Sequence, residues 1–307
     1  MAKIEELHRY YLAEIKDKIF YERKGIEGKQ YVVLYLHDAI KEIESFVDTF
    51  VQYFPYYVWN EDQLEMLDIS INAKAALDNI SRKCWSSQVV PKRTTSTNGI
   101  YGELYLDFYE RIVNERKLIT TYASRRSYLN NQESKGFDHL GYIFKNNKLE
   151  IVLGEAKYVS GASEAKNNLL SDVRGKSDGS EMGHLTKDYI NDFMNFIVQI
   201  NNQFSEAERM ELKSLIKDLN HKLVNENWSF LEYIIDKDIR INVVLFAIFK
   251  STYKGPKQLE RHYDELFEET KNALLGMGIA NYSIEIVFIP TEANSMHIKE
   301  KIDEFYR

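Results

Sequence analysis

Two apolar segments joined by a short polar turn place the tightest constraint on how this chain can fold. Residues 137–144 and 149–159 are rich in aromatic and β-branched side chains, and Asn146-Asn147 lies between them. Asparagine tolerates the positive φ that a tight hairpin turn requires. The pattern predicts two adjacent antiparallel strands.

The second predicted strand ends in an acid and a lysine on one face. Glu155 and Lys157 are two residues apart, and alternate residues of a strand project to the same side. Asp138, in the first predicted strand, joins them across the hairpin. Two adjacent carboxylates repel each other unless a cation lies between them, and Mg²⁺ prefers such oxygen ligands. The pattern predicts metal-assisted phosphodiester hydrolysis, in which Lys157 orients the nucleophile or neutralises the developing negative charge.

The acid-x-Lys tripeptide is not specific by itself, because Glu164-Ala165-Lys166 and other segments match it too. The context of Glu155-Ala156-Lys157 is different, since it closes a strongly apolar strand that follows an acid-bearing one. The alternative is an edge strand on which Glu155 and Lys157 face solvent or pair with each other. A buried strand has little reason to carry both charges unless they have a function.

Periodicity elsewhere in the chain predicts a mixed α/β protein. The expected elements before the hairpin are a strand over 31–36, a helix over 38–54 that ends before Pro55, and a helix over 103–118. The stretch 159–181 is rich in Ser, Gly, Asn and charge, which is typical of a mobile loop. The last third alternates strand 240–250, helix 257–275, strand 283–289 and a C-terminal helix.

The composition predicts a folded chain without a flexible linker. Of 307 residues 44% are hydrophobic, and there are only 14 Gly and 4 Pro. We expect an N-terminal extension, residues 1–80, packed on a core domain of residues 81–307. One cysteine, Cys84, excludes an intramolecular disulfide and a Cys-based zinc knuckle. The charged N-terminus and the shortness of the apolar runs predict a cytoplasmic protein with no membrane partner.

Charge is unevenly distributed along the chain. The net charge of −7 argues against a nucleic-acid partner, but residues 81–176 contain 16 Lys and Arg against 10 Asp and Glu. The rest of the chain carries 24 basic and 37 acidic residues. We expect the basic clusters to contact DNA phosphates, with solvated surface as the alternative. Their members are Arg82, Lys83, Lys92, Arg93, Arg125 and Arg126.

The order of the charged motifs resembles the PD-(D/E)xK restriction-endonuclease-like superfamily. Glu103 lies on a predicted helix, and Phe137-Asp138-His139 and Gly154-Glu155-Ala156-Lys157 lie on the two strands. More narrowly, GELYLDFYERIV, GFDHLGYI and LGEAKY resemble the HamA family, the nuclease subunit of the Hachiman anti-phage defence system. Phe137 stands where the superfamily nominally has Pro. No clear fourth motif is assigned, although Lys187 and Tyr189 are candidates.

This resemblance implies an α/β restriction-endonuclease-like core, a mixed central sheet flanked by helices, with a helical and strand extension at the N-terminus. It implies Mg²⁺ or Mn²⁺ bound by Asp138 and Glu155, with Glu103 completing or buttressing the acidic cluster, and Lys157 as the catalytic lysine. It further implies a DNA endonuclease effector in phage defence. A helicase subunit, HamB, would restrain and license it in a heteromeric complex.

Two other functions stay open at the level of the residues. One is a non-catalytic adaptor that binds a helicase or DNA with a decayed nuclease fold, against which the intact acids and Lys157 argue. The other is a metal-dependent hydrolase of RNA or nucleotides, because the motif does not distinguish sugars or bases. We interpret His139 as a packing or substrate-facing residue. Asp107 and Glu110, on the helix face of Glu103, are interpreted as solvated or structural.

Overall fold

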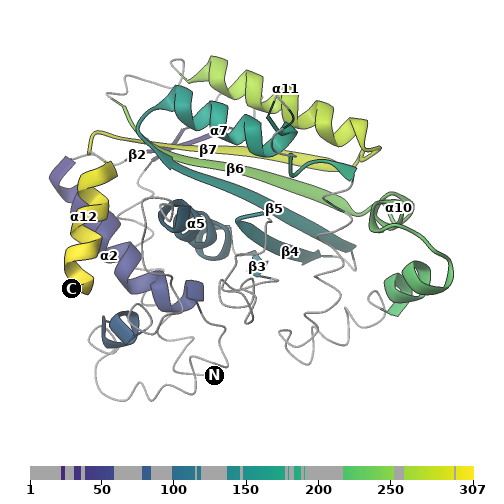
Figure 1. The fold of residues 1–307 in the computed structure, drawn as a ribbon, viewed down its shortest axis with the longest axis horizontal. Coiled ribbons are helices and arrows are strands. Elements are labelled where there is room, and N and C mark those ends of the chain that lie inside the picture. Colours follow the sequence, from purple (N-terminus) through teal and green to yellow (C-terminus); the bar gives the residue numbers. More distant parts are fainter. Residues whose placement is uncertain are drawn as a thin grey trace.

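A computed structural model shows one continuous sheet at the centre of the chain (Figure 1). The sheet has seven strands in the order β1-β2-β7-β6-β5-β4-β3. The structure describes residues 22–24, 31–35, 39–58, 78–83, 99–114, 116–118, 137–145, 148–176, 179, 183–187, 190, 217–251, 259–293 and 295–307.

The three longest strands form the parallel middle of the sheet. Strand β6 (Arg240–Lys250) pairs in parallel with β5 (Lys148–Val159) on one side and with β7 (Tyr282–Thr291) on the other. All residues from Ile241 to Phe249 are buried. A parallel strand covered on both faces needs apolar side chains at nearly every position, which explains why this run is continuous instead of alternating.

The predicted hairpin is confirmed. Strand β4 (His139–Lys145) runs antiparallel to β5, with His139 opposite Gly154 and Lys145 opposite Lys148. The two asparagines of the turn lie outside the described residues. Strand β3 (Lys117–Leu118) adds to β4 at the edge of the sheet. Asp138 lies immediately before β4 instead of inside it.

The N-terminal strands extend the same sheet. Strand β2 (Tyr31–Tyr35) pairs in parallel with β7, and β1 (Glu22–Lys24) pairs antiparallel with β2. The division between an extension and a core at residue 80 stays a prediction.

Helix α2 (Ala39–Val58) continues through Pro55, so the predicted end before this proline is wrong. Proline removes one helical hydrogen bond. Phe54, Tyr56 and Tyr57, however, are all at most 2% exposed, and we attribute the extra turn to their burial. Among the helices that the structure describes, α2 included, none has both the length and the apolar composition needed to cross a membrane.

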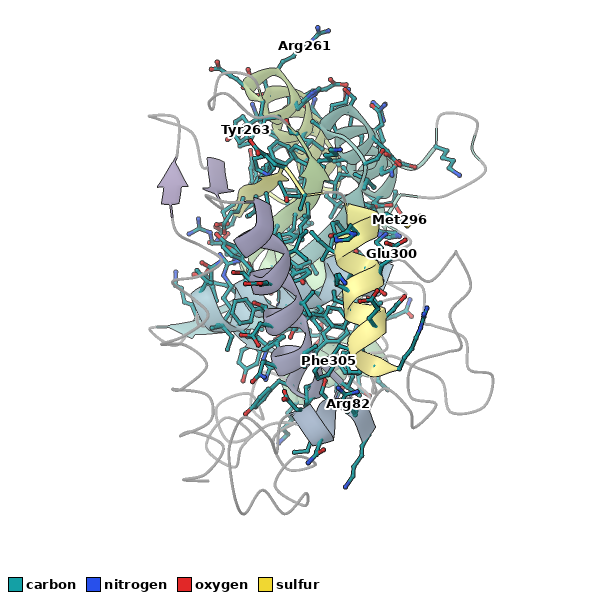
Figure 2. All side chains as sticks on the ribbon, turned by 90° about the vertical axis from the view of Figure 1, so that its left-hand side faces the viewer. Arg82, Arg261, Tyr263, Met296, Glu300 and Phe305 are labelled. Carbon is teal, nitrogen blue, oxygen red and sulfur yellow. The ribbon has the colours of Figure 1, made fainter. Side chains whose placement is uncertain are left out.

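Helices cover both faces of the sheet (Figure 1). On one face lie α2, α5 (Gly99–Phe108) and α12 (Ser295–Tyr306), and α2 and α12 run side by side in both views (Figure 2). On the other lie α7 (Ala162–Arg174) and α11 (Glu260–Gly276). The α/β restriction-endonuclease-like fold class is therefore confirmed. A short helix, α10 (Phe230–Asp236), begins with a Ser229–Glu232 capping box and leads into β6.

Two further predictions of secondary structure are wrong, the end of one helix and the assignment of one loop. The helix predicted over 103–118 is α5 followed by a π-helix, η2 (Tyr109–Val113), and ends before β3. The predicted loop 159–181 contains α7, whose buried residues Ala165, Leu169 and Val173 recur every four positions. The polar residues that suggested a loop belong to the remaining faces of this helix.

We predict that Leu245→Ala in β6 destabilises the protein by about 3 kcal/mol, because Leu245 is fully buried and truncation leaves a cavity. The matched variant Leu275→Ala, at a side chain that is 47% exposed, should cost less than about 1 kcal/mol. Urea unfolding followed by circular dichroism measures both. Equal losses would show that β6 is not the centre of the core.

Candidate functional site

Glu155 and Lys157 lie on the face of β5 that α7 covers. Ile151 and Leu153, which share this face by alternation, pack in one core cluster with Leu169 and Val173 of α7. The intervening residues Val152, Ala156 and Tyr158 pack in the other cluster, with α5. Helices therefore cover both faces of the strand. In the plane of the sheet β6 pairs with residues 150–159 of β5, whereas β4 pairs with β5 only as far as Gly154. The alternative that Glu155 faces solvent is wrong, because Glu155 is 2% exposed.

Asp138 and Glu155 form a close carboxyl pair. The Asp138 Oδ2 atom accepts a hydrogen bond of 2.8 Å from the backbone N–H of Ala156, which holds this carboxylate at the neighbouring strand. Burial raises the pKa of Glu155 well above its ordinary value, and the charges of Asp138 and Asp172 and a hydrogen bond with Asp138 raise it further. The pair therefore disfavours two negative charges unless a cation compensates them.

Lys157 is held in its charged form. Its Nζ atom lies 2.5 Å from Oδ2 of Asp172 on α7. Burial alone would lower the pKa of Lys157, but the charges of Asp138, Asp172 and Glu155 outweigh burial and raise the pKa above its ordinary value. These charges favour the ammonium form of Lys157, which donates hydrogen bonds.

Two further residues of the site, Asp172 and His184, were not predicted from the sequence. His184 Nδ1 pairs with Oε1 of Glu155, and its backbone N–H donates a 2.6 Å hydrogen bond to the carbonyl of Asp172. Gly183 permits this approach, because a Cβ atom there would lie 2.4 Å from backbone atoms of Arg174 and Gly175. No motif marks either residue. The four-residue apolar spacing of α7 was the one available signal that this segment packs on the sheet.

Glu103 approaches β5 from the opposite face. It follows Gly102, where a Cβ atom would lie 3.3 Å from the backbone carbon of Lys157, so α5 passes very close to the strand. Glu103 is 7% exposed, and its carboxylate accepts a 2.6 Å hydrogen bond from the Tyr57 hydroxyl of α2. The structure thus joins Asp138, Glu155 and Lys157 on one face, and a role of Glu103 as a metal ligand stays a prediction.

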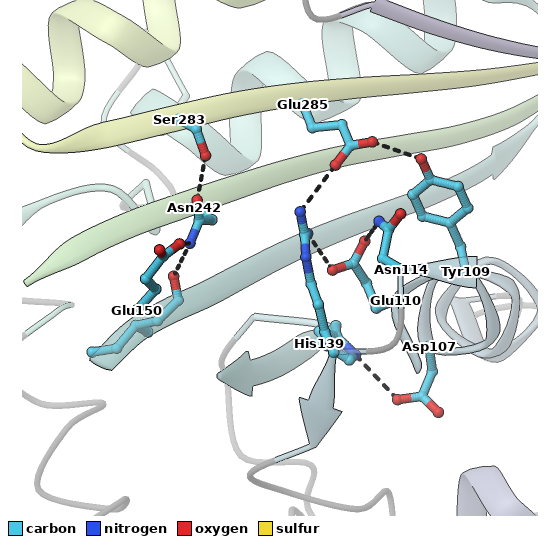
Figure 3. Close-up of polar contacts among 11 residues, drawn as sticks. Asp107, Tyr109, Glu110, Asn114, His139, Glu150, Asn242, Ser283 and Glu285 are labelled. Atoms are coloured by element: carbon cyan, nitrogen blue, oxygen red, sulfur yellow. Dashed lines mark hydrogen bonds and ion pairs between the residues drawn. The ribbon is translucent and has the colours of Figure 1, made fainter. Parts of the chain in front are cut away.

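His139 belongs to a buried polar network with Asp107 (Figure 3). Its Nδ1 lies 3.1 Å from Asp107 Oδ1, and Asp107 also accepts a 2.6 Å hydrogen bond from Tyr53. Burial would raise the pKa of Asp107, but Arg111 and His139 together lower it. These contacts support the interpretation of His139 as a packing residue.

Asp107 and Glu110 are not solvated, contrary to one of the two expectations for them. They are 3% and 0% exposed. Glu110 lies on the π-helix and pairs with Arg116 at 2.5 Å, and Arg116 also lies 3.2 Å from Glu285 on β7 (Figure 3). Both acids are therefore structural groups that link α5 and η2 to the sheet.

The predicted DNA contacts lie only partly within the described residues. Arg82 and Lys83 are exposed, and the Arg82 guanidinium lies 4.0 Å from the ring centroid of Phe305, near the end of α12 (Figure 2). Lys187 is also exposed. Lys92, Arg93, Arg125, Arg126 and Tyr189 lie outside the described residues. Contact with DNA stays a prediction for all of them.

The Asp138–Glu155 pair fits a hard divalent cation that keeps part of its water shell. In the ranges that the structure describes, no three His, Cys, Asp or Glu side chains converge in a way that could hold a metal ion. Mg²⁺ is commonly bound through one or two carboxylates together with waters and phosphate oxygens. Two carboxylates with a charge excess are thus a donor set compatible with such an ion, and Mn²⁺ accepts the same ligands.

We predict that the stability gain from Glu155→Gln grows with pH. The pKa of Glu155 in the folded protein is raised above 4.5, its ordinary value in the unfolded chain. The folded protein therefore keeps this proton to a higher pH than the unfolded chain does, and it loses stability as the pH rises from 4.5 to the folded-state pKa. In EDTA, the free energy of unfolding of the variant relative to the wild type should increase by about 1 kcal/mol or more between pH 4 and pH 8. A difference that is constant with pH would contradict the raised pKa.

Comparison with known proteins agrees with the resemblance found in the sequence. A family model described as HamA matches residues 12–306, a range that contains the whole carboxylate and lysine cluster. No curated protein matches the chain. The match covers nearly the full length, and the chain therefore belongs to the HamA family of the Hachiman anti-phage defence system.

Proposed function

We propose that this chain is a metal-dependent DNA endonuclease, the effector of a Hachiman system. The observation that supports the proposal most strongly is the close pair of Asp138 and Glu155, with Lys157 on the same face of β5. A structural ion pair would explain one acid and one lysine. It does not explain a second carboxyl group whose presence raises the pKa of the first.

Asp138 and Glu155 would hold the cation, which when bound polarises a phosphoryl oxygen and lowers the pKa of a coordinated water. Lys157 supplies a fixed positive charge and hydrogen-bond donors beside this pair. Its positive charge is suited to neutralise charge that develops on a phosphate. His184 and Asp172 contact the side chains of Glu155 and Lys157, respectively.

DNA is the proposed substrate on two grounds. The middle third of the sequence, which contains the proposed site, is the basic part of the chain. The HamA family also belongs to a defence system directed against phages. RNA contains the same phosphodiester, so a test of the proposal requires both substrates.

We predict that Lys157→Ala lowers plasmid cleavage by about 100-fold or more, because it removes the charge next to the scissile phosphate. Lys166→Ala is the matched control, since Lys166 ends the same Glu-Ala-Lys tripeptide and pairs with Glu265 of α11 at 2.7 Å. It should cleave like the wild type. Supercoiled plasmid and a structured RNA are each incubated with Mg²⁺ or with EDTA.

A metal-binding measurement distinguishes the role of the two carboxylates from that of Lys157. Asp138→Ala and Glu155→Ala should lose both cleavage and calorimetrically detected Mn²⁺ binding, whereas Lys157→Ala should lose cleavage alone. Full activity of purified Glu155→Ala would rule out this site. Cleavage of RNA but not of plasmid would show that the substrate is RNA and not DNA. Binding of DNA without cleavage of either substrate would favour a non-catalytic adaptor.

Control by a helicase partner is the second part of the proposal. A nuclease that contacts mainly backbone phosphates would also cut host DNA, so it must be held inactive before infection. The sequence contains no GxxxxGK[ST] phosphate-binding loop, so an ATP-dependent trigger would come from another protein. The acidic remainder of the chain offers a surface on which such a partner could dock.

We predict that the chain forms a stable complex with a helicase encoded beside it, and that the complex cleaves DNA only when the helicase engages DNA and hydrolyses ATP. Size-exclusion chromatography after co-expression tests the complex, and plasmid cleavage with and without ATP tests the control. Separate elution with equal cleavage in all conditions would remove the regulatory part and leave the nuclease activity standing.

A further inference from the structure

The segment after β5 returns to the proposed site and contacts both of its β5 side chains. Lys157 pairs with Asp172, and Glu155 pairs with His184. The backbone of Asp172 and His184 is joined by a 2.6 Å hydrogen bond. Two residues of one strand are thus matched by two residues that are linked to each other, and the contacts form a closed ring.

Helix α7 fixes the place of Asp172 in this ring. Leu169 and Val173 are at most 1% exposed and anchor the helix on the sheet, which sets the rotation of the residue between them. The end of the helix is fixed as well, because the N–H groups of His184 and Leu185 donate to the carbonyls of Asp172 and Val173. The Asp172 carboxylate is therefore carried by a rigid element.

The ion pair with Asp172 restricts the position of the Lys157 ammonium group. The Asp172 and Lys157 side chains are 20% and 24% exposed, so their attraction is partly shielded from water. The lysine side chain is a flexible four-carbon stem that ends in a point charge. Attachment to β5 alone would leave the ammonium group of Lys157 free to move. An ion pair from a second element removes that freedom.

We propose that Asp172 is the positioning residue of Lys157: it holds the ammonium group, from α7, beside the Asp138–Glu155 pair where the substrate phosphate is expected. This inference rests on the proposed nuclease function and supplies the fourth position of the site, for which the sequence indicated only Lys187 and Tyr189. The alternative is that the Asp172 carboxylate competes with the substrate phosphate for Lys157, in which case Asp172 would act as a brake that slows cleavage.

The activity test uses Asp172→Asn and Asp172→Glu under single-turnover conditions. Asp172→Asn keeps the shape but not the charge, so the maximal cleavage rate should fall about 10- to 100-fold while the half-saturating DNA concentration changes less than about twofold. Asp172→Glu, which restores the carboxylate, should recover part of the rate. The matched control is Glu265→Gln, which removes the carboxylate partner of Lys166 instead and should leave the rate unchanged.

A second measurement does not depend on nuclease activity. Pulse acetylation with acetic anhydride, followed by peptide mass spectrometry, reports how strongly each lysine is held. In Asp172→Asn, acetylation of Lys157 should rise several-fold while that of Lys166 stays constant. In Glu265→Gln, acetylation of Lys166 should rise several-fold while that of Lys157 stays constant. A general loss of folding would raise both labels together, which distinguishes it from loss of one ion pair.

The outcomes are distinct. Asp172→Asn with wild-type cleavage and unchanged Lys157 labelling overturns the inference, and faster cleavage shows a brake instead of a positioning residue. If wild-type protein cleaves no nucleic acid, the proposed nuclease function fails. Labelling of Lys157 then still decides whether Asp172 holds this lysine.

Discussion

The structure depends on keeping two carboxyl groups next to each other, that of Glu155, which is buried, and that of Asp138, which is half-buried. Such a pair is unfavourable in the absence of a cation, so the surrounding fold has to impose it. The β4–β5 register sets Asp138 beside the end of the pairing, at His139 opposite Gly154, and the Ala156 N–H holds its carboxylate. Parallel pairing with β6 then fixes Glu155 from the other side.

The two faces of β5 have different tasks. On the α5 face, Gly102 allows helix and strand to approach closely, and the Asp107–His139 and Glu110–Arg116–Glu285 contacts pair the buried polar groups with partners. On the α7 face, the charges converge on a small area around Lys157. The first face gives rigidity, and the second concentrates the groups that would bind metal and phosphate.

The sequence was sufficient where local pattern and tertiary environment agree. The hairpin and the apolar strands β6 and β7 were predicted because turn residues and side-chain patterning are local signals. The helix α7 was missed because only one face of it is apolar, and the end of α2 was misplaced because buried aromatic residues continue the helix past Pro55. Asp172 and His184 could not be predicted, since each meets its partner only through the packing of α7 on the sheet.

Anomalous diffraction from crystals soaked in Mn²⁺ would show whether Asp138 and Glu155 hold a divalent cation together. We expect a manganese peak in contact with the carboxylates of both residues, and the loss of that peak in crystals of Glu155→Ala. A peak elsewhere in the molecule with none at this pair, or a peak that persists in Glu155→Ala, would contradict this expectation.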